Sequence, residues 1–165
     1  MRIFFHPIIQ SNLNNNIMKT IFALAAGLLF SMSASSQVLK PVKWSYAAKK
    51  TSATEATVLI KATMGDGWHI YSQTIPEGGP LKTTFAFAPA KSFSLKGKVA
   101  EPKPLSKFEK VFGTNVNYFE KEVVFQQKIK LTGAETIVKG TVEFMICSDK
   151  QCLPPQTIDF SIPVS

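Results

Sequence analysis

The alternation of side chains in residues 119–131 constrains the fold more than any other feature of the sequence. Successive side chains of a β-strand point to opposite faces of a sheet, so a two-residue period predicts a strand with one buried face. One set of alternate positions is mostly apolar, and the other is mostly polar or charged. The predicted buried set is Val123, Phe125, Gln127 and Ile129, and the opposite set is Val124, Gln126, Lys128 and Lys130.

Other segments also have the composition of strands. They are rich in β-branched and aromatic residues or repeat apolar residues at every second position, and Gly65-Asp66-Gly67 predicts a turn between the first two. No segment after residue 36 keeps a helical period for about ten residues. We therefore predict an all-β chain, and many short strands between turns are typical of an immunoglobulin-like β-sandwich. The further predicted strands are residues 54–64, 67–74, 83–88, 136–147 and 157–163.

Residues 101–117 do not have the pattern of a strand. The segment begins rich in proline and then places Phe108, Val111 and Phe112 beside charged residues and Gly113. A long loop with several apolar residues is unusual in a compact domain and is often functional. The alternative is a surface loop that its aromatic residues anchor into the core.

The N-terminal segment has the features of an export signal. Residues 21–30 form an apolar run that follows Lys19 and precedes small residues ending at Ser36. This pattern is typical of a secretory signal peptide, whereas a membrane-spanning helix needs about 20 apolar residues. We predict a true start at Met18, an upstream segment and signal peptide over residues 1–36, and one exported domain over residues 37–165. A retained membrane anchor is the alternative.

The charge of the chain argues against a nucleic-acid partner. The net charge is +8, and it falls to +6 without residues 1–36, which contain Arg2, Lys19 and no acidic residue. No arginine occurs after residue 36. Proteins that recognise nucleic acids depend on arginine for bidentate contacts with bases and phosphates. We therefore predict no nucleic-acid binding, and lysines on solvated strand faces of a monomeric domain.

The two cysteines of the chain, Cys147 and Cys152, are close in the sequence. In an exported protein they are expected to form a disulfide, because that compartment is oxidising. In the chain-entropy model, such a short loop stabilises by only about 2 kcal/mol, compared with ~4.7 kcal/mol for a loop of ~100 residues. A domain over residues 37–165 can build its own core. A structural bridge remains the alternative, but these values favour a redox-active pair.

A metal site is a further hypothesis for the same sulfurs. Cys147 and Cys152, together with His69 and either Met64 or Met145, form a ligand set suited to Cu(I). The spacing is not that of a C-x2-C motif, and a histidine within a strand is more often a packed residue than a ligand. We therefore predict no metal, and a Cu(I) carrier stays an alternative function.

Residues 147–157 resemble the N-terminal periplasmic domain of the thiol:disulfide interchange protein DsbD. That family has two cysteines a few residues apart at a strand end, followed by an apolar or aromatic residue and two prolines. This chain has Leu153-Pro154-Pro155 at that place. Residues 67–72 are similar to the glycine-aromatic strand of the family, and residues 108–119 are similar to a loop that caps the cysteines.

The resemblance implies an immunoglobulin-like domain of the periplasm that exchanges disulfides without a cofactor. It implies that electrons come from a thioredoxin-like domain of a membrane reductase and go to disulfide isomerases or related thiol proteins. By position, Cys152 corresponds to the cysteine that forms mixed disulfides with donor and acceptor, and Cys147 to its resolving partner. Tyr71 and Tyr118 are expected to pack around the disulfide.

The resemblance also identifies candidate cap residues. The family has an aromatic residue before a glycine in the capping loop, which indicates Phe112 before Gly113, with Val111 as the competing position. Phe108 is a further candidate for shielding the disulfide. Where the family has an acidic pair, this chain has Glu109-Lys110, so a role for that pair in proton handling is not expected.

The sequence departs from the family at its C-terminal side. The family protein continues into a membrane domain and a thioredoxin-like domain, whereas this sequence ends at Ser165 without a C-x2-C motif. The expected partners are therefore a separate membrane thiol reductase and thioredoxin-like or disulfide-isomerase-like envelope proteins. A non-redox immunoglobulin-like interaction module, with a disulfide that only stiffens a loop, is the alternative.

Overall fold

The computed structural model describes residues 40–165. The predicted start at Met18, the signal peptide and its cleavage after Ser36 lie outside these residues. Eleven strands and no helix make up the described part of the chain, and every strand pairing in it is antiparallel. Accordingly, it contains no helix that could cross a membrane. The predicted all-β, immunoglobulin-like class is confirmed.

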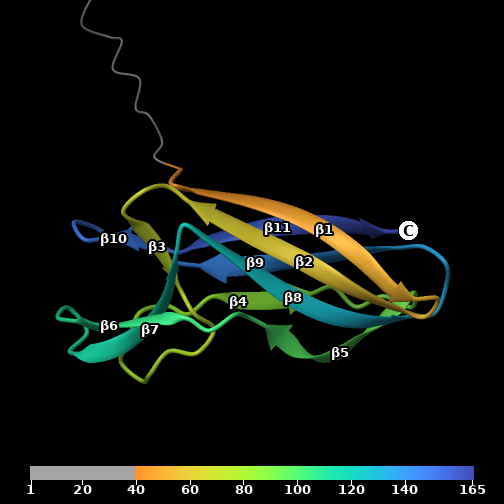
Figure 1. Ribbon diagram of the computed structural model, residues 1–165, viewed down its shortest axis with the longest axis horizontal. Coiled ribbons are helices and arrows are strands. Elements are labelled where there is room, and N and C mark those ends of the chain that lie inside the picture. The colour runs from red at the N-terminus through yellow and green to blue at the C-terminus, as the bar shows by residue number, and fades with distance from the viewer. Residues whose placement is uncertain (1–39) are drawn as a thin grey trace, which may run out of the picture. The chain divides into compact units, whose positions relative to one another are not determined.

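The strands form three sheets, which Figure 1 shows in one view. The first sheet has the order β1 (Val42–Ser52), β2 (Glu55–Met64), β8 (Glu122–Leu131) and β5 (Phe93–Ala100). The second has the order β11 (Gln156–Val164), β9 (Thr136–Phe144) and β4 (Thr84–Phe87). The third has the order β10 (Ile146–Ser148), β3 (Trp68–Tyr71), β7 (Thr114–Glu120) and β6 (Leu105–Glu109).

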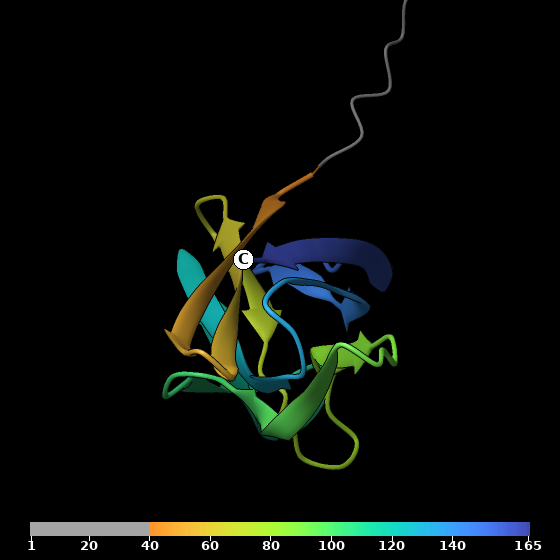
Figure 2. The same ribbon diagram turned by 90° about the vertical axis from the view of Figure 1, so that its right-hand side faces the viewer.

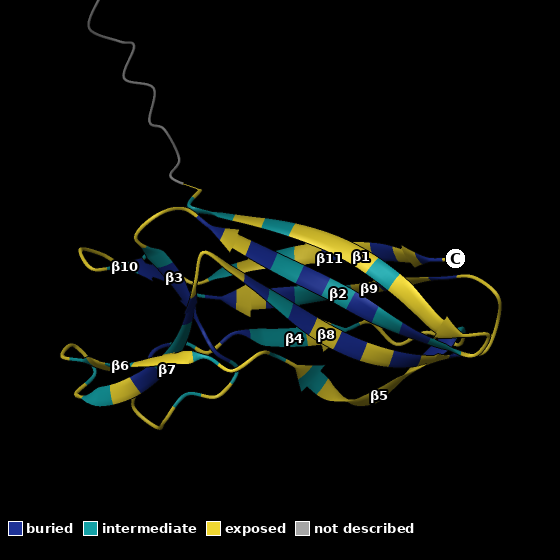
Figure 3. Cartoon of the chain, in the orientation of Figure 1, coloured by how far each residue is buried: buried dark blue, intermediate teal, exposed yellow. Residues whose placement is uncertain are grey.

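The first two sheets face each other and enclose the main core. In the end-on view of Figure 2, orange β1 and β2 lie on the opposite side from blue β9 and β11. Along most of β2, β8, β9 and β11, buried positions alternate with intermediate or exposed ones, which Figure 3 shows as colour bands. The predicted buried face of β8 is confirmed, and its polar member Gln127 donates from Nε2 to the carbonyls of Lys128 and Lys96, at 2.7 and 3.3 Å. Two-residue periodicity therefore determines which side chains form the core.

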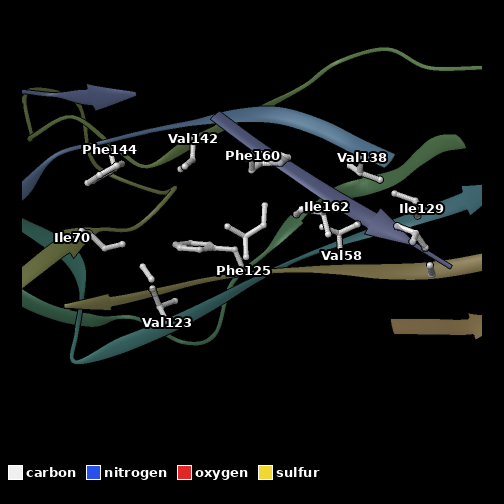
Figure 4. Close-up of a cluster of buried hydrophobic side chains, with 14 of the residues drawn as sticks. Val58, Ile70, Val123, Phe125, Ile129, Val138, Val142, Phe144, Phe160 and Ile162 are labelled. Atoms are coloured by element: carbon white, nitrogen blue, oxygen red, sulfur yellow. The ribbon is translucent and has the colours of Figure 1, made fainter. Parts of the chain in front are cut away.

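Phe125 lies at the centre of this core, completely buried. Its ring centroid is 4.9 Å from that of Phe85 on β4, 5.9 Å from Phe119 on β7 and 6.4 Å from Trp44 on β1. These three rings come from the three different sheets, and aromatic pairs at such distances contribute beyond their buried area. Figure 4 shows Phe125 among aliphatic side chains of the core, including Val58 and Ile162. One side chain therefore joins all three sheets.

The third sheet is made by strands that leave the sandwich. The segments predicted as single strands over residues 119–131 and 136–147 are each divided in two. Lys121, with φ of 60°, separates β7 from β8, and Met145 separates β9 from β10. These breaks direct β7 and β10 onto β3, a change of sheet that a hydrophobic pattern alone does not reveal. Figure 1 places β10 and the β6–β7 hairpin at the end of the domain opposite the C-terminus.

The prediction of a loop over residues 101–117 is wrong for most of its length. Residues 105–120 form the β6–β7 hairpin, in which Lys107 pairs with Val116 and Glu109 with Thr114. Phe108 is 61% exposed, so the apolar residues of the first strand do not follow the usual pattern of burial. The sequence pattern also does not predict strands β1 and β5, because residues on both faces of these strands are exposed.

The position of Phe125 predicts a large effect of truncation. Replacing Phe125 with Ala should lower the free energy of unfolding by about 3–5 kcal/mol, because the change leaves a cavity among three sheets. Chemical denaturation of the domain over residues 37–165 measures this loss. The matched control is Leu95→Ala, at a position 45% exposed, which should change the value by less than about 0.5 kcal/mol. Similar losses in the two variants would contradict this description of the core.

Candidate functional site

The two cysteines form a disulfide within a short hairpin, residues 146–153. Cys147 and Cys152 face each other as an antiparallel pair with their Cα atoms 4.0 Å apart. On either side of this pair, the Ser148 amide donates to the Gln151 carbonyl at 2.8 Å, and the Leu153 amide donates to the Ile146 carbonyl at 2.9 Å. The pair therefore occupies a position without mutual backbone hydrogen bonds, where opposite residues approach most closely.

The side chain of Ser148 stabilises the turn of this cysteine hairpin. Its hydroxyl accepts from the amides of Lys150 and Gln151, at 3.3 and 3.2 Å. Serine side chains that bond to the backbone two or three residues further on are typical of such turns. The turn brings the chain back within reach of β10, so that the second cysteine lies beside the first.

The two bonded sulfurs belong to residues of very different exposure. Cys147 is 1% exposed and packs with Tyr71 and Val116, next to the partly buried Met145 and Tyr118. Cys152, on the returning arm of the hairpin, is exposed. An attacking thiolate needs access to the sulfur it attacks. The geometry therefore leaves Cys152 as the reachable end of the disulfide and protects Cys147.

The tip of the β6–β7 hairpin lies opposite the cysteine hairpin. The amides of Phe112 and Gly113 both donate to the carbonyl of Glu109, at 3.1 and 2.9 Å, and Gly113 has the positive φ of 65° that this tight turn requires. A cavity of about 400 Å³ separates the two hairpins. Its walls are Tyr71, Glu109, Val111, Phe112 and residues 147–152.

The structure brings some of the predicted cap residues to this cavity. Phe112 is half-buried and Val111 is 87% exposed, and both line the cavity opposite the cysteines. Phe108 is exposed and is not part of the lining. Of the two predicted tyrosines, Tyr71 lines the cavity and Tyr118 packs on the cluster that buries Cys147.

Lys107 forms a charged link between the two hairpins. Its Nζ lies 2.9 Å from a carboxylate oxygen of Glu109 and 3.8 Å from one of Asp149, in the turn between the cysteines. It also lies 4.9 Å from the centroid of the Tyr118 ring. Asp149 is highly exposed, and exposed ion pairs contribute only about 0–1 kcal/mol. The contact between Lys107 and Asp149 therefore contributes little to the stability of this arrangement of the two hairpins.

His69 is a site residue that sequence reasoning treated only as a packed residue or metal ligand. It is 3% exposed and contacts the rings of Tyr71 and Tyr118 edge-on, at centroid distances of 5.4 and 5.3 Å. Its Nε2 has no hydrogen-bond partner and lies 4.0 Å from Glu109 Oε1. Burial, and secondarily Lys107, lowers the pKa of His69, while Glu109 acts in the opposite direction.

Burial also affects Tyr71, which forms one wall of the cavity. Desolvation, with a smaller contribution from the negative charge of Glu109, raises the pKa of Tyr71 to about 12. The phenol is therefore neutral throughout the physiological pH range. Tyr71 can pack and donate a hydrogen bond in this cavity, but it cannot serve there as an anionic base.

The residues suggested for Cu(I) do not all belong to one cluster. Met64 is buried in the main core, whereas Met145 packs beside Cys147. Within residues 40–165, no three His, Cys, Asp or Glu side chains are grouped as a metal site would require. In the disulfide, both sulfurs are bonded to each other.

The fold and the site together define an immunoglobulin-like domain with a cross-strand disulfide that faces a second hairpin. The family model described as thiol:disulfide interchange protein DsbD, N-terminal, matches residues 35–163. The chain therefore belongs to this family, as its cysteine segment predicted. No curated protein matches the chain in a sequence search.

Solved structures support the same fold. The N-terminal periplasmic domain of ScsB from Proteus mirabilis superposes with a TM-score of 0.55 and 20% identity, over 79% of this chain. This chain spans about half of that protein, 48% of its length. The complex between the DsbD N-terminal and the PilB N-terminal domains from Neisseria meningitidis gives 0.50 and 18%, over 76% of this chain and 88% of the matched one.

The unequal exposure of the cysteines predicts unequal reactivity. After reduction, Cys152 should react with iodoacetamide at least about tenfold faster than Cys147, because Cys147 is packed beneath Tyr71. Alkylation rates of the matched variants Cys147→Ser and Cys152→Ser, measured by mass spectrometry under native conditions, isolate each thiol. Both thiols should react alike in denaturant, and equal rates in the folded state would contradict the assignment.

Proposed function

We propose that this chain is an exported thiol–disulfide exchange domain of the bacterial envelope. It passes electrons between a membrane or thioredoxin-like reductase and envelope partner proteins through Cys147 and Cys152. The observation that carries the proposal is the pairing of one reachable sulfur with one protected sulfur. A disulfide that served only stability would need no difference in exposure between its two cysteines. A disulfide that closes so short a loop also contributes only about 2 kcal/mol.

The exchange with a partner has two steps. The thiolate of reduced Cys152 attacks one sulfur of the partner's disulfide, and the partner's other sulfur leaves as a thiolate that takes a proton from water. The thiolate of Cys147 then attacks the Cys152 sulfur of the mixed disulfide, and the partner's second sulfur leaves and is protonated. Two electrons have moved to the partner, which is reduced to a dithiol, and the domain ends with the Cys147–Cys152 disulfide.

The reductase restores the dithiol by the reverse sequence. One of its thiolates attacks Cys152, the exposed end of the disulfide, and releases Cys147 as a thiolate. A second thiolate of the reductase then attacks the reductase sulfur of this mixed disulfide. Cys152 leaves as a thiolate, and the reductase is left with a disulfide. Donor and acceptor therefore use the same sulfur in turn, and no cofactor is involved.

The tip of the β6–β7 hairpin limits access to Cys152. Phe112 and Val111 are the cap residues in this proposal, since they line the cavity on the side opposite the cysteines. A partner thiol that enters between the hairpins passes the exposed Val111, which lines the cavity. Phe108 lies outside the cavity lining and is better placed to contact the body of the partner than to shield the disulfide.

Several observations support the cellular setting of this proposal. The family model and the periplasmic ScsB domain support a periplasmic location, and the unit Lys40–Ser165 supports a single domain over residues 37–165. In Neisseria meningitidis, a DsbD N-terminal domain forms a complex with a PilB domain, which supports a protein as the substrate. We propose thioredoxin-like or disulfide-isomerase-like partners, a separate membrane thiol reductase and a monomeric domain.

The mechanism predicts which cysteine variant traps a partner. Reduced Cys147→Ser, mixed with an oxidised disulfide isomerase of the thioredoxin fold, should accumulate a mixed disulfide through Cys152, because the resolving sulfur is missing. Non-reducing electrophoresis and peptide mass spectrometry identify the bond. The trapped fraction should greatly exceed that formed by wild-type protein, which resolves the intermediate.

The matched control is Cys152→Ser, which retains only the buried thiol and should form no adduct. Both variants lose the same short bridge and should remain folded, with a similar loss of about 2 kcal/mol in stability. If both folded variants form no adduct, or if both bind the isomerase equally without a covalent bond, the non-redox interaction module is favoured instead.

A further inference from the structure

His69 lies directly beside the buried cysteine. Strands β3 and β10 are antiparallel neighbours, and their register pairs Cys147 with His69. Directly opposite residues of such a pair point to the same face, with Cβ atoms about 4.5–5.5 Å apart. Both residues are buried, at 1% and 3% exposure. The imidazole is therefore the titratable side chain that the sheet places next to the Cys147 sulfur.

The buried nitrogen of His69 has no hydrogen-bond partner in the fold. An unpaired buried polar atom costs about 1–3 kcal/mol, and such atoms in a folded protein call for a functional explanation. Nε2 faces the Glu109 carboxylate at 4.0 Å, too far for a hydrogen bond and close enough for Coulombic attraction. The Glu109 carboxylate is therefore placed to stabilise a positive charge on His69 that forms only transiently.

Burial is the main reason that His69 is neutral in the disulfide form at neutral pH. Burial lowers its pKa most, and Lys107 lowers it further, while the carboxylates of Glu109, Asp149 and Glu120 raise it. A neutral imidazole has one nitrogen available to accept a proton. The groups that face it come from four segments: Tyr71 on β3, Lys107 and Glu109 on β6, Tyr118 and Glu120 on β7, and Asp149 in the cysteine turn.

The resolving step needs a base at this place. A free cysteine has a pKa of about 8.5, and burial in apolar surroundings raises it, so little Cys147 thiolate exists at neutral pH. At 1% exposure, Cys147 has almost no contact with bulk water that could take the proton. Tyr71, the neighbouring hydroxyl, stays protonated because its pKa is about 12. Of the remaining titratable groups, Glu109 lies on the facing hairpin, whereas His69 is directly opposite Cys147 in the register of β3 and β10.

We infer that His69 accepts the proton of the Cys147 thiol during resolution of the mixed disulfide, and that Glu109 stabilises the resulting imidazolium. This inference rests on the proposed exchange function. The S–H bond of Cys147 breaks and its proton moves to the imidazole. The thiolate then bonds to the Cys152 sulfur, and the partner sulfur leaves with the electron pair and is protonated by water. The imidazolium finally returns its proton to solvent.

A two-step aryl disulfide reaction tests this inference. Equimolar 5,5′-dithiobis(2-nitrobenzoate) releases one coloured thiolate when reduced Cys152 attacks, and a second when Cys147 resolves the mixed disulfide. In His69→Gln, the first release should be unchanged and the second should slow about 10–100-fold at pH 7, the range of modest general-base catalysis. The difference should close above about pH 9, where hydroxide ionises the thiol without the imidazole.

The control variants separate chemistry from packing. Ile70→Val removes one buried methylene group from β3, the strand that carries His69. It should leave the pH profile of the second release unchanged. Glu109→Gln should slow the second release less than His69→Gln does, because it removes only the stabilising charge. A wild-type profile in His69→Gln, or an equal slowing at every pH, would overturn the inference.

A measurement on the unmutated protein guards against a folding defect in the variant. In the reduced form, the proton resonance of the His69 ring should show an inflection when Cys147 ionises beside it. The disulfide form should lack this inflection and show only the later ionisation of the neighbouring tyrosines. Identical titration curves in the two forms would contradict the inference. Failure of the proposed function itself gives a different result, because Cys147→Ser would then trap no partner protein, whatever the two release rates with the aryl disulfide.

Discussion

The packing of β10 against β3 is the constraint on which the rest of the site depends. It buries Cys147 against Tyr71 and Val116, while the turn at Ser148 returns Cys152 to the exposed side of the same hairpin. One bond therefore connects a protected sulfur to a reachable one. The order of attack and the internal base that we propose both follow from this difference in burial.

The sandwich supports the site through two strands that continue beyond it. Segments 114–131 and 136–148 each belong to the core over most of their length, and the breaks at Lys121 and Met145 carry their ends to the third sheet. Phe125 joins the three sheets at the point where they meet. The cysteine hairpin and the facing hairpin therefore project from a rigid base, and their relative position depends mainly on backbone pairing rather than on weak surface ion pairs.

Much of the fold could be predicted from side-chain alternation, but only part of the site. The period of two identified β8 and β11 because each has one buried face, and the β-branched composition identified β2. It missed the β6–β7 hairpin, where Phe108 and Val111 are exposed. The cysteine segment indicated the family, whereas the pairing of His69 with Cys147 joins residues far apart in the sequence and depends on the break at Met145. Local patterns contain no information about such a contact.

The reduction potential of the Cys147–Cys152 pair tests the central claim most directly. Equilibration of the domain over residues 37–165 in glutathione and dithiothreitol buffers, with mass-spectrometric determination of the oxidised fraction, gives this value. An exchange domain should have a potential between about −270 and −120 mV, the range of known thiol–disulfide exchange proteins. A potential well below about −300 mV is typical of structural disulfides and would contradict the account.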